Sequence, residues 1–220
     1  MIASLTSTPS PTPTLTFTPT NTILPTITPN ATMTEAYNNM ITVVNDFYKQ
    51  GYIPSLQGRY LPMYNYVNSW AQIGWYRWTN TDFYPKDFVL TAHMDWNSAS
   101  DTPNESGCGI TFRIQPSDEH YVVFVLSTGY LEFAIRTDRF RDNGRQYYGA
   151  PAKNGSVEFS MTAVGNKIDI FINNKHIYTY TGLQGKMLDG ELGYTVLSGT
   201  NADYGTKCII SHSNLWMITP

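Results

Sequence analysis

Apolar and polar residues alternate one by one over much of the chain after residue 73. Because successive side chains of a β-strand point to opposite faces, this pattern predicts strands that each bury one apolar face. Residues 121–126 (YVVFVL) are instead apolar without interruption, which is typical of a central strand covered on both sides. The clearest alternating segments are residues 88–94, 110–114, 131–136, 157–163 and 168–172.

Short turn signals separate these segments. Gly129, the pair Gly165 and Asn166, and the pair Asn173 and Asn174 each lie between two of them. Glycine and asparagine tolerate the positive φ that a tight hairpin needs. Strands that follow one another at such short intervals predict an all-β fold, an antiparallel sandwich or barrel.

One helix is expected before the strands. Thr32 followed by Glu35 matches a capping box, and apolar residues then recur at helical spacing until Gly51, which can end the helix. Pro54 and Pro62 follow in a tyrosine-rich stretch without clear periodicity. This stretch predicts an irregular connector between the helix and the first strand.

The first part of the chain has a different composition. Between Ser7 and Pro29 it contains six prolines and is otherwise mostly threonine, and no charged residue precedes Glu35. Such a segment cannot form a helix or a core, and it is typical of extended, often O-glycosylated stalks. The threonines predicted to carry sugar are Thr12, Thr14, Thr16, Thr18 and Thr20.

These patterns divide the chain into three parts. Residues 1–31 form the Thr/Pro-rich extended tail, residues 32–72 the helix and irregular connector, and residues 73–220 the sandwich on which that helix packs. The tail also contains β-branched residues that could add a strand to a neighbouring copy. Self-assembly through the tail is therefore an alternative to a free stalk.

Composition bears on location and partners. Only 14% of the residues are charged, the net charge is −3, and basic residues do not cluster, so nucleic acid is not expected as a partner. The sequence contains no run of eighteen apolar residues, so no segment of it is expected to span a membrane. We expect Cys108 and Cys208 to form a disulfide, as in proteins of the extracellular space or the cell surface.

Three segments carry a resemblance to a known fold family. Residues 167–177 (KIDIFINNKHI), 190–196 (GELGYTV) and 214–218 (NLWMI) resemble the later strands of concanavalin A-like (LamG-like) jelly-roll domains. With the Thr/Pro-rich stalk, the chain also resembles exported bacterial modules. The resemblance covers residues 73–218, and implies two curved antiparallel sheets with a concave face that many relatives use to hold saccharides.

Stacking on sugar rings and bonding to their hydroxyls requires aromatic and polar side chains. Tyr147 and Tyr148 lie in a polar loop beside Arg145, and Trp96 is a further candidate for ligand binding. Since adjacent residues of a strand point opposite ways, one of the two tyrosines is expected to face outward. Trp75 and Trp78 are candidates as well, but for them and for Trp216 packing in the core or at its rim is the expectation.

An oxygen-rich segment between two strands could bind Ca²⁺. Asp95, Asn97 and Asp101 offer the oxygen ligands that calcium prefers, although their spacing matches no known motif. An ordinary polar turn is the alternative explanation. No other cofactor is indicated.

No catalytic motif is recognised. Glycoside hydrolysis requires two carboxyl groups across the scissile bond, and the Glu-x-Asp-x-x-Glu pattern of jelly-roll glycosidases is absent. Glu132, Glu158 and Asp169 occur singly on predicted strands and are expected to be solvated. The primary hypothesis is a non-catalytic module that binds glycan or another extracellular polymer. The alternatives are an O-glycosylated filament subunit and, more weakly, a glycoside hydrolase.

Overall fold

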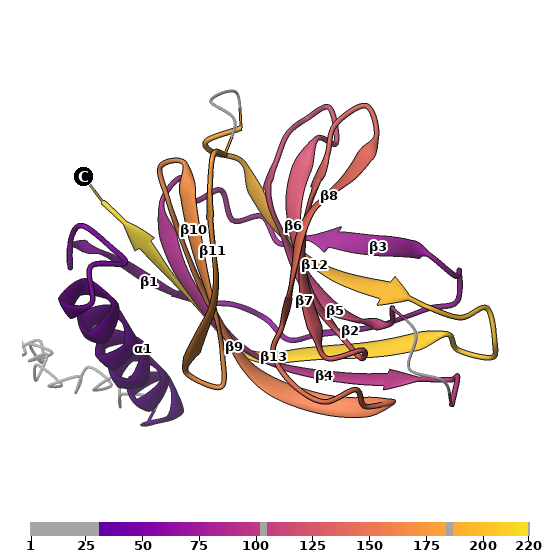
Figure 1. The fold of residues 1–220 in the computed structure, drawn as a ribbon. Helices are drawn as coiled ribbons and strands as arrows, with labels where there is room; N and C mark the ends of the chain where they lie inside the picture. Colours follow the sequence, from indigo (N-terminus) through magenta and orange to yellow (C-terminus); the bar gives the residue numbers. More distant parts are fainter. Residues whose placement is uncertain (1–30, 102–104, 184–186, 220) are drawn as a thin grey trace, which may run out of the picture.

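The computed structural model describes residues 31–101, 105–183 and 187–219, which form two antiparallel sheets and one helix (Figure 1). The predicted all-β jelly-roll sandwich with one N-terminal helix is confirmed. Within these residues, no helix is long and apolar enough to cross a membrane. The predicted stalk, its candidate glycosylation sites Thr12, Thr14, Thr16, Thr18 and Thr20, and its docking on a neighbour all fall outside the described residues.

The first sheet, called sheet A, has the order β1-β13-β4-β9-β10-β11, with β2 also paired to β13. Its strands are β1 (Gly58–Pro62), β2 (Tyr66–Trp70), β4 (Phe88–Ser98), β9 (Asn154–Val164), β10 (Lys167–Ile172), β11 (Lys175–Thr181) and β13 (Thr206–Ile218). The final strand, β13, pairs with the first, β1.

The second sheet, called sheet B, has the order β3-β12-β5-β6-β7-β8. Its strands are β3 (Trp75–Asn80), β5 (Gly107–Ile114), β6 (His120–Leu126), β7 (Tyr130–Arg136), β8 (Phe140–Tyr147) and β12 (Glu191–Ser198).

The two sheets bury their alternating apolar residues against each other. Leu90, Met94 and Phe159 of sheet A and Phe112 and Phe133 of sheet B belong to one cluster, and each is at most 1% exposed. Each such side chain contributes about 1.5 to 3 kcal/mol by leaving water. The alternation seen in the sequence therefore corresponds to this shared interior.

The hairpin signals are confirmed. Asn173 and Asn174, between β10 and β11, have φ values of 51° and 62°, and Gly129, between β6 and β7, has a φ of 81°. A β-branched residue would be strained in this left-handed region. The turns thus fix which strands become neighbours.

Helix α1 (Ala31–Lys49) covers part of the outer face of sheet A. Met40, Val44 and Phe47 are buried against the strands, and the ring of Phe47 stacks on that of Phe171 with 4.4 Å between centroids. Figure 1 shows α1 at one side of the molecule beside β1, with β3, β6 and β7 at the other side.

The end of the helix is as predicted, but its start is not. Gly51 has a φ of 77°, the amide of Gly51 donates to the carbonyl of Tyr48, and that of Tyr52 donates to the carbonyl of Phe47. This is the Schellman arrangement that ends a helix. Thr32, expected as the N-cap, lies inside the helix, because α1 begins at Ala31.

The predicted irregular connector is wrong in part. Residues 58–70 contain β1 and β2, which both pair with β13, so the sandwich begins at Gly58 and not at residue 73. Pro62 is compatible with β1 because β1 is the edge strand of sheet A and needs hydrogen bonds on one side only. Short strands in which apolar and polar residues do not clearly alternate cannot be predicted from periodicity.

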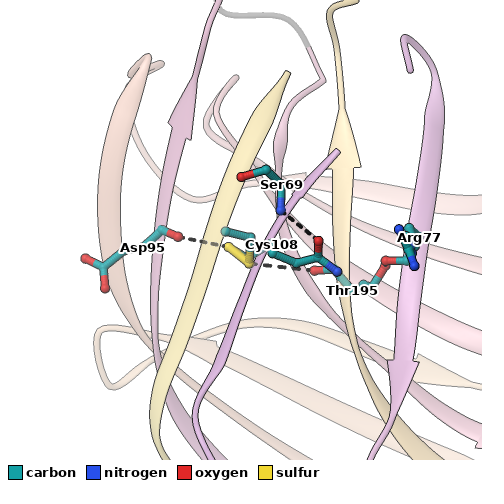
Figure 2. The surroundings of a disulfide bond; sticks show 7 residues. Ser69, Arg77, Asp95, Cys108 and Thr195 are labelled. Atoms are coloured by element: carbon teal, nitrogen blue, oxygen red, sulfur yellow. Dashed lines mark hydrogen bonds between the residues drawn. A yellow bond between two sulfur atoms is a disulfide. The ribbon is translucent and has the colours of Figure 1, made fainter. Parts of the chain in front are cut away.

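The expected disulfide joins the two sheets. Cys108 lies on β5 of sheet B and Cys208 on β13 of sheet A, with their Cα atoms 5.4 Å apart (Figure 2). Both side chains are completely buried. The Sγ atom of Cys108 lies 3.0 Å from the carbonyl oxygen of Asp95. The bond therefore links β5 to β13 through the middle of the core.

Replacing both cysteines by alanine should lower the free energy of unfolding by about 4 to 5 kcal/mol. The physical reason is that the cross-link joins residues separated by 100 positions and restricts the unfolded chain. Urea denaturation of the oxidised protein and of C108A/C208A measures the difference. Dithiothreitol should move the wild-type midpoint toward that of the variant and leave the variant unchanged; equal midpoints without reductant would contradict the prediction.

Candidate functional site

Sheet B is apolar on its outer face as well as on its inner face. Val122, Phe124 and Leu126 of β6 point away from the core and form a second cluster with Ala134 and Leu197. The single helix of the described residues lies on sheet A, so it does not cover this cluster. The outer face of sheet B must therefore be shielded in another way.

Aromatic residues from the edge strand β3 provide that shield. The ring of Tyr76 lies 5.3 Å from the ring of Phe124 and 5.6 Å from the ring of Phe140. Tyr76 and Phe140 belong to the two opposite edge strands of sheet B, β3 and β8. Their contact shows that the sheet curves strongly, so that its outer face is concave.

Small residues make this curvature possible. Gly109 and Gly193 lie on the neighbouring strands β5 and β12, between the two edges. A Cβ atom at Gly193 would lie 2.4 Å from Oγ1 of Thr111, and one at Gly109 would lie 2.8 Å from Cγ2 of Thr195. These approaches are shorter than van der Waals contact, so larger side chains would not fit on the floor of the concave face.

A pocket of about 380 Å³ opens on the concave face. One part of its lining is aromatic, from Trp75, Tyr76, Phe124 and Phe140. Trp75, expected in the core or at its rim, is 61% exposed. The charged part of the lining comes from Glu105, Glu132, Arg136, Asp138 and Arg139.

Glu132 was expected to be a solvated residue, and this prediction is wrong. The residue is only 4% exposed, and Oε2 lies 2.7 Å from Nη2 of Arg145. Arg145 stands directly opposite Glu132 in the β7–β8 register. The same guanidinium holds Glu105, whose Oε1 lies 2.7 Å from Nη1. Arg145 thus bridges two carboxylates at the pocket.

His120 was not singled out by the sequence, yet it is fully buried on the concave face, where it contacts Tyr76. Its Nδ1 is 2.7 Å from the carbonyl oxygen of Asp118, which can only accept, so Nδ1 carries the proton. Nε2 therefore accepts the hydrogen bond of the Tyr76 hydroxyl, at 2.9 Å. Burial lowers the pKa of His120 to about 4, so the ring is neutral at pH 7.

Arg136 lies next to this histidine. Its guanidinium carbon is 4.9 Å from the centroid of the Trp78 ring, which in turn lies 4.8 Å from the ring of His120. Burial raises the pKa of Tyr76, and a side-chain hydrogen bond to Arg136 opposes that shift. Three strands, β3, β6 and β7, thus contribute to one connected group.

The buried neutral His120 should make stability fall in acid. Its folded pKa of about 4 is below the unfolded value near 6.5, so its contribution is present above pH 6.5 and lost as the pH falls toward 4. The loss is about 3 kcal/mol over this range. We expect His120→Asn, which can still donate to Asp118, to remove this part of the pH dependence, as measured by urea unfolding at several pH values. A parallel decline in both proteins would contradict the assignment.

Two of the four predicted ligand residues, Arg145 and Tyr147, lie on the outer face of sheet B. Arg145 and Tyr147 share the face of Glu132, because Tyr147 is the register partner of Tyr130 and Arg145 that of Glu132. The rings of Tyr130 and Tyr147 lie 5.5 Å apart, and both are exposed.

The other two candidates are tied into the protein. The Tyr148 hydroxyl donates to the carbonyl of Leu126 at 2.7 Å, and burial raises its pKa. Trp96 is buried in the core cluster and donates through Nε1 to the carbonyl of Ala152. Of the two adjacent tyrosines, one therefore faces outward, as expected. Trp216 is buried beneath α1, as expected of a core tryptophan, and Trp78 is half-buried.

The candidate calcium ligands each have a protein partner. Asp95 lies near His93, Asn97 accepts a hydrogen bond from Tyr204, and Asp101 pairs with Lys153. Within the described residues, no group of three histidine, cysteine or acidic side chains could hold a metal ion. The calcium site stays a prediction.

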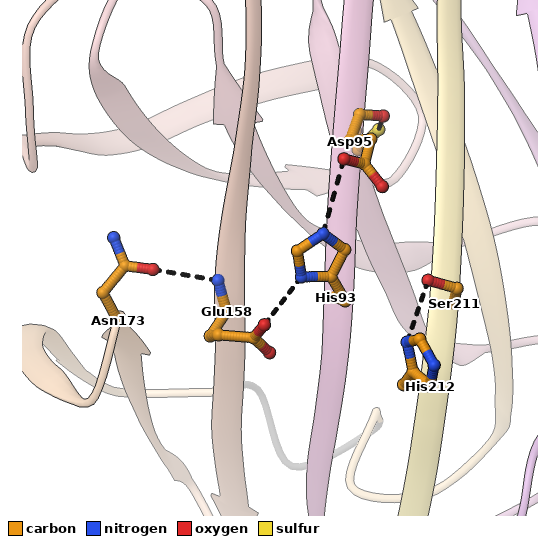
Figure 3. A network of polar contacts seen from close by, with 7 residues as sticks. His93, Asp95, Glu158, Asn173, Ser211 and His212 are labelled. Carbon is orange, nitrogen blue, oxygen red and sulfur yellow. Dashed lines mark hydrogen bonds and ion pairs between the residues drawn. The ribbon is translucent and has the colours of Figure 1, made fainter.

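The other two acidic candidates lie on the outer face of sheet A. Glu158 is exposed there and bonds to His93, as Figure 3 shows. Asp169, expected to be solvated, is only 1% exposed, because Lys167 and Thr179 bond to its carboxylate. Since Glu158 and Glu132 lie on opposite outer faces of the sandwich, they cannot act on one glycosidic bond.

His93 lies between two carboxylates (Figure 3). Nδ1 is 2.7 Å from Oε1 of Glu158, and Nε2 is 3.4 Å from Oδ1 of Asp95. The hydrogen bond to Glu158 is the main cause of its raised pKa. The ring of His212 is 6.4 Å away and has no ion pair with a described residue.

The raised pKa means that protonated His93 stabilises the fold below about pH 6.5 and that this contribution is lost as the pH rises through the folded value. We expect His93→Gln to lower the thermal midpoint more at pH 5.5 than at pH 9. His212→Gln is the matched control and should show no such difference. If His93→Gln had the same effect at both pH values, His93 would not be held in its charged form by these carboxylates.

Comparison with known proteins gives the fold but no family. No protein-family model and no curated protein matches the sequence. The structure is similar to the carbohydrate binding module CBM66 from Bacillus subtilis, with a TM-score of 0.50 and 10% identity over 69% of this chain and 91% of that one.

Two longer structures are similar over part of their length. A structure described as A. japonicus CB05 has a TM-score of 0.52 and 12% identity over 73% of this chain and 26% of that one. The Aspergillus kawachii β-fructofuranosidase complexed with glycerol has a TM-score of 0.50 and 9% identity over 72% of this chain and 27% of that one. The chain thus spans about a quarter of their length. These likenesses show a β-sandwich fold, which agrees with the concanavalin A-like jelly roll that the sequence resembles.

Proposed function

We propose that this protein is a non-catalytic, extracellular or cell-surface module that binds glycan in the pocket on the concave face of sheet B. The observation that carries the proposal is the composition of that pocket, in which exposed aromatic rings stand beside fixed charged groups. Its volume of about 380 Å³ is in the range of small-molecule sites.

The aromatic residues would supply the contact with sugar rings. A pyranose has apolar C–H faces and polar edges, so a site for it needs flat apolar surfaces next to hydrogen-bonding groups. Trp75 and Phe140 line the pocket and are both exposed. Glu105 and Arg136 stand beside them and could bond to hydroxyl groups.

The pairing of the carboxylates supports binding without hydrolysis. A glycosidase needs one carboxyl group that keeps a proton to give to the leaving oxygen. Both of these carboxylates, Glu105 and Glu132, are instead occupied by one guanidinium, that of Arg145.

Two further observations support the location and the ligand class. The disulfide between Cys108 and Cys208 is of the kind that persists in oxidising compartments outside the cytosol. One structural neighbour is a carbohydrate binding module, and the similarity covers 91% of its length. At 10% identity this neighbour supports the ligand class by analogy of fold.

Removal of an exposed ring from the pocket should weaken binding. A glycan array with the full chain identifies a ligand, and calorimetry then measures its affinity for Trp75→Ala and Phe140→Ala. We expect each to lose about tenfold, which is about 1.4 kcal/mol. Tyr84→Ala is the control, because Tyr84 is 62% exposed and Trp75 61%, and Tyr84 does not line the pocket. The proposal fails if no glycan binds, or if Tyr84→Ala weakens binding as much as the pocket variants do.

A further inference from the structure

Arg136 differs from the other arginines of the concave face. Arg139 lies 3.7 Å from Asp138, and Arg145 bridges Glu105 and Glu132. Among the described residues, Arg136 forms no ion pair with a carboxylate, although it lines the pocket. The pocket therefore contains one cation without an acidic partner in the described part of the chain.

This cation is held in place by neutral groups. The guanidinium lies over the Trp78 ring at 4.9 Å, and its proximity to the Tyr76 hydroxyl opposes the rise that burial causes in the pKa of that tyrosine. The Tyr76 hydroxyl is oriented by His120, and His120 by the backbone carbonyl of Asp118. The Tyr76 hydroxyl and Nδ1 of His120 each have a defined acceptor, so the groups that surround Arg136 are ordered before a ligand arrives.

The surrounding acidic groups are already compensated. Arg145 bonds to Glu132 and Glu105, and Arg139 and Arg141 both lie within 3.8 Å of Asp138. These carboxylates would therefore repel a negatively charged ligand group less than unpaired carboxylates would. A guanidinium presents several N–H donors in one plane, which match the two oxygens of a carboxylate.

We propose that the pocket selects acidic saccharides, with the carboxylate of a uronic acid unit bound by Arg136 and the sugar ring against Trp75 or Phe140. This inference rests on the proposed function and deepens it by naming the class of sugar. Sugars without a charged group would bind more weakly, because they leave the guanidinium without an anion.

The test compares a galacturonic acid trimer with its methyl ester, which has the same rings but no charge. Calorimetry with the full chain should show the acid bound about 10 to 100 times more tightly than the ester, the range expected for a charge-assisted bidentate bond. Arg136→Gln should abolish the preference, so that the acid and the ester bind the variant with the same affinity.

Controls separate the possible outcomes. Arg139→Gln removes an exposed arginine of the same pocket that is already paired, and should preserve the preference for the acid. Thermal unfolding of Arg136→Gln establishes that the variant is folded; if it is not, Arg136→Lys, which keeps the charge without the planar fork, should lose most of the preference. Equal affinity of the wild type for acid and ester would overturn the inference while glycan binding stands. Binding of neither these sugars nor any glycan on the array would overturn the proposed function itself.

Discussion

Sheet B is apolar on both of its faces, and the rest of the structure follows from the need to shield both. The inner face is covered by sheet A, in a core that includes the disulfide between Cys108 and Cys208. No helix of the described chain covers the outer face. There the ring of Tyr76, on β3, packs against the rings of Phe124 and Phe140. A flat sheet could not bring its two edge strands into contact. Curvature, the shielding aromatic residues and the pocket therefore have one cause.

The two outer faces of the sandwich differ in their chemistry. On sheet A, the apolar part is covered by α1 and the remainder carries polar residues such as His93 and Glu158, which are partly or fully exposed to water. On sheet B, the polar groups are set among aromatic rings. Hydrogen bonds and ion pairs are stronger in such surroundings and harder to replace by water. The concave face is therefore the more suitable of the two for holding a polar ligand in one orientation.

Much of the fold could be predicted from the sequence, because alternation and turn residues are local signals. The strands around Leu90, Phe133 and Ile170, the hairpin at Asn173 and the helix end at Gly51 all followed from them. Of the predicted ligand residues, Arg145 pairs with two carboxylates that line the pocket, and Tyr147 shares the face of Glu132 but is not among the lining residues. The burial of Glu132 depends on Arg145 in the next strand, and the role of His120 depends on Tyr76, which is 44 residues away. Periodicity gives the face on which a residue lies, but it does not identify the cross-strand partner.

The contrast between His93 and His120 shows how the environment determines the chemistry of a residue type. His93 lies between two carboxylates near water, and its pKa is raised. His120 lies under aromatic rings beside Arg136, and burial lowers its pKa to about 4. Because His120 is neutral, its lone pair can orient the Tyr76 hydroxyl and it adds no second positive charge beside Arg136. A protonated ring there would repel the guanidinium and lose the acceptor on which the position of Tyr76 depends. The neutral, buried imidazole thus keeps its hydrogen bond to Tyr76 and leaves Arg136 without a neighbouring positive charge on β6.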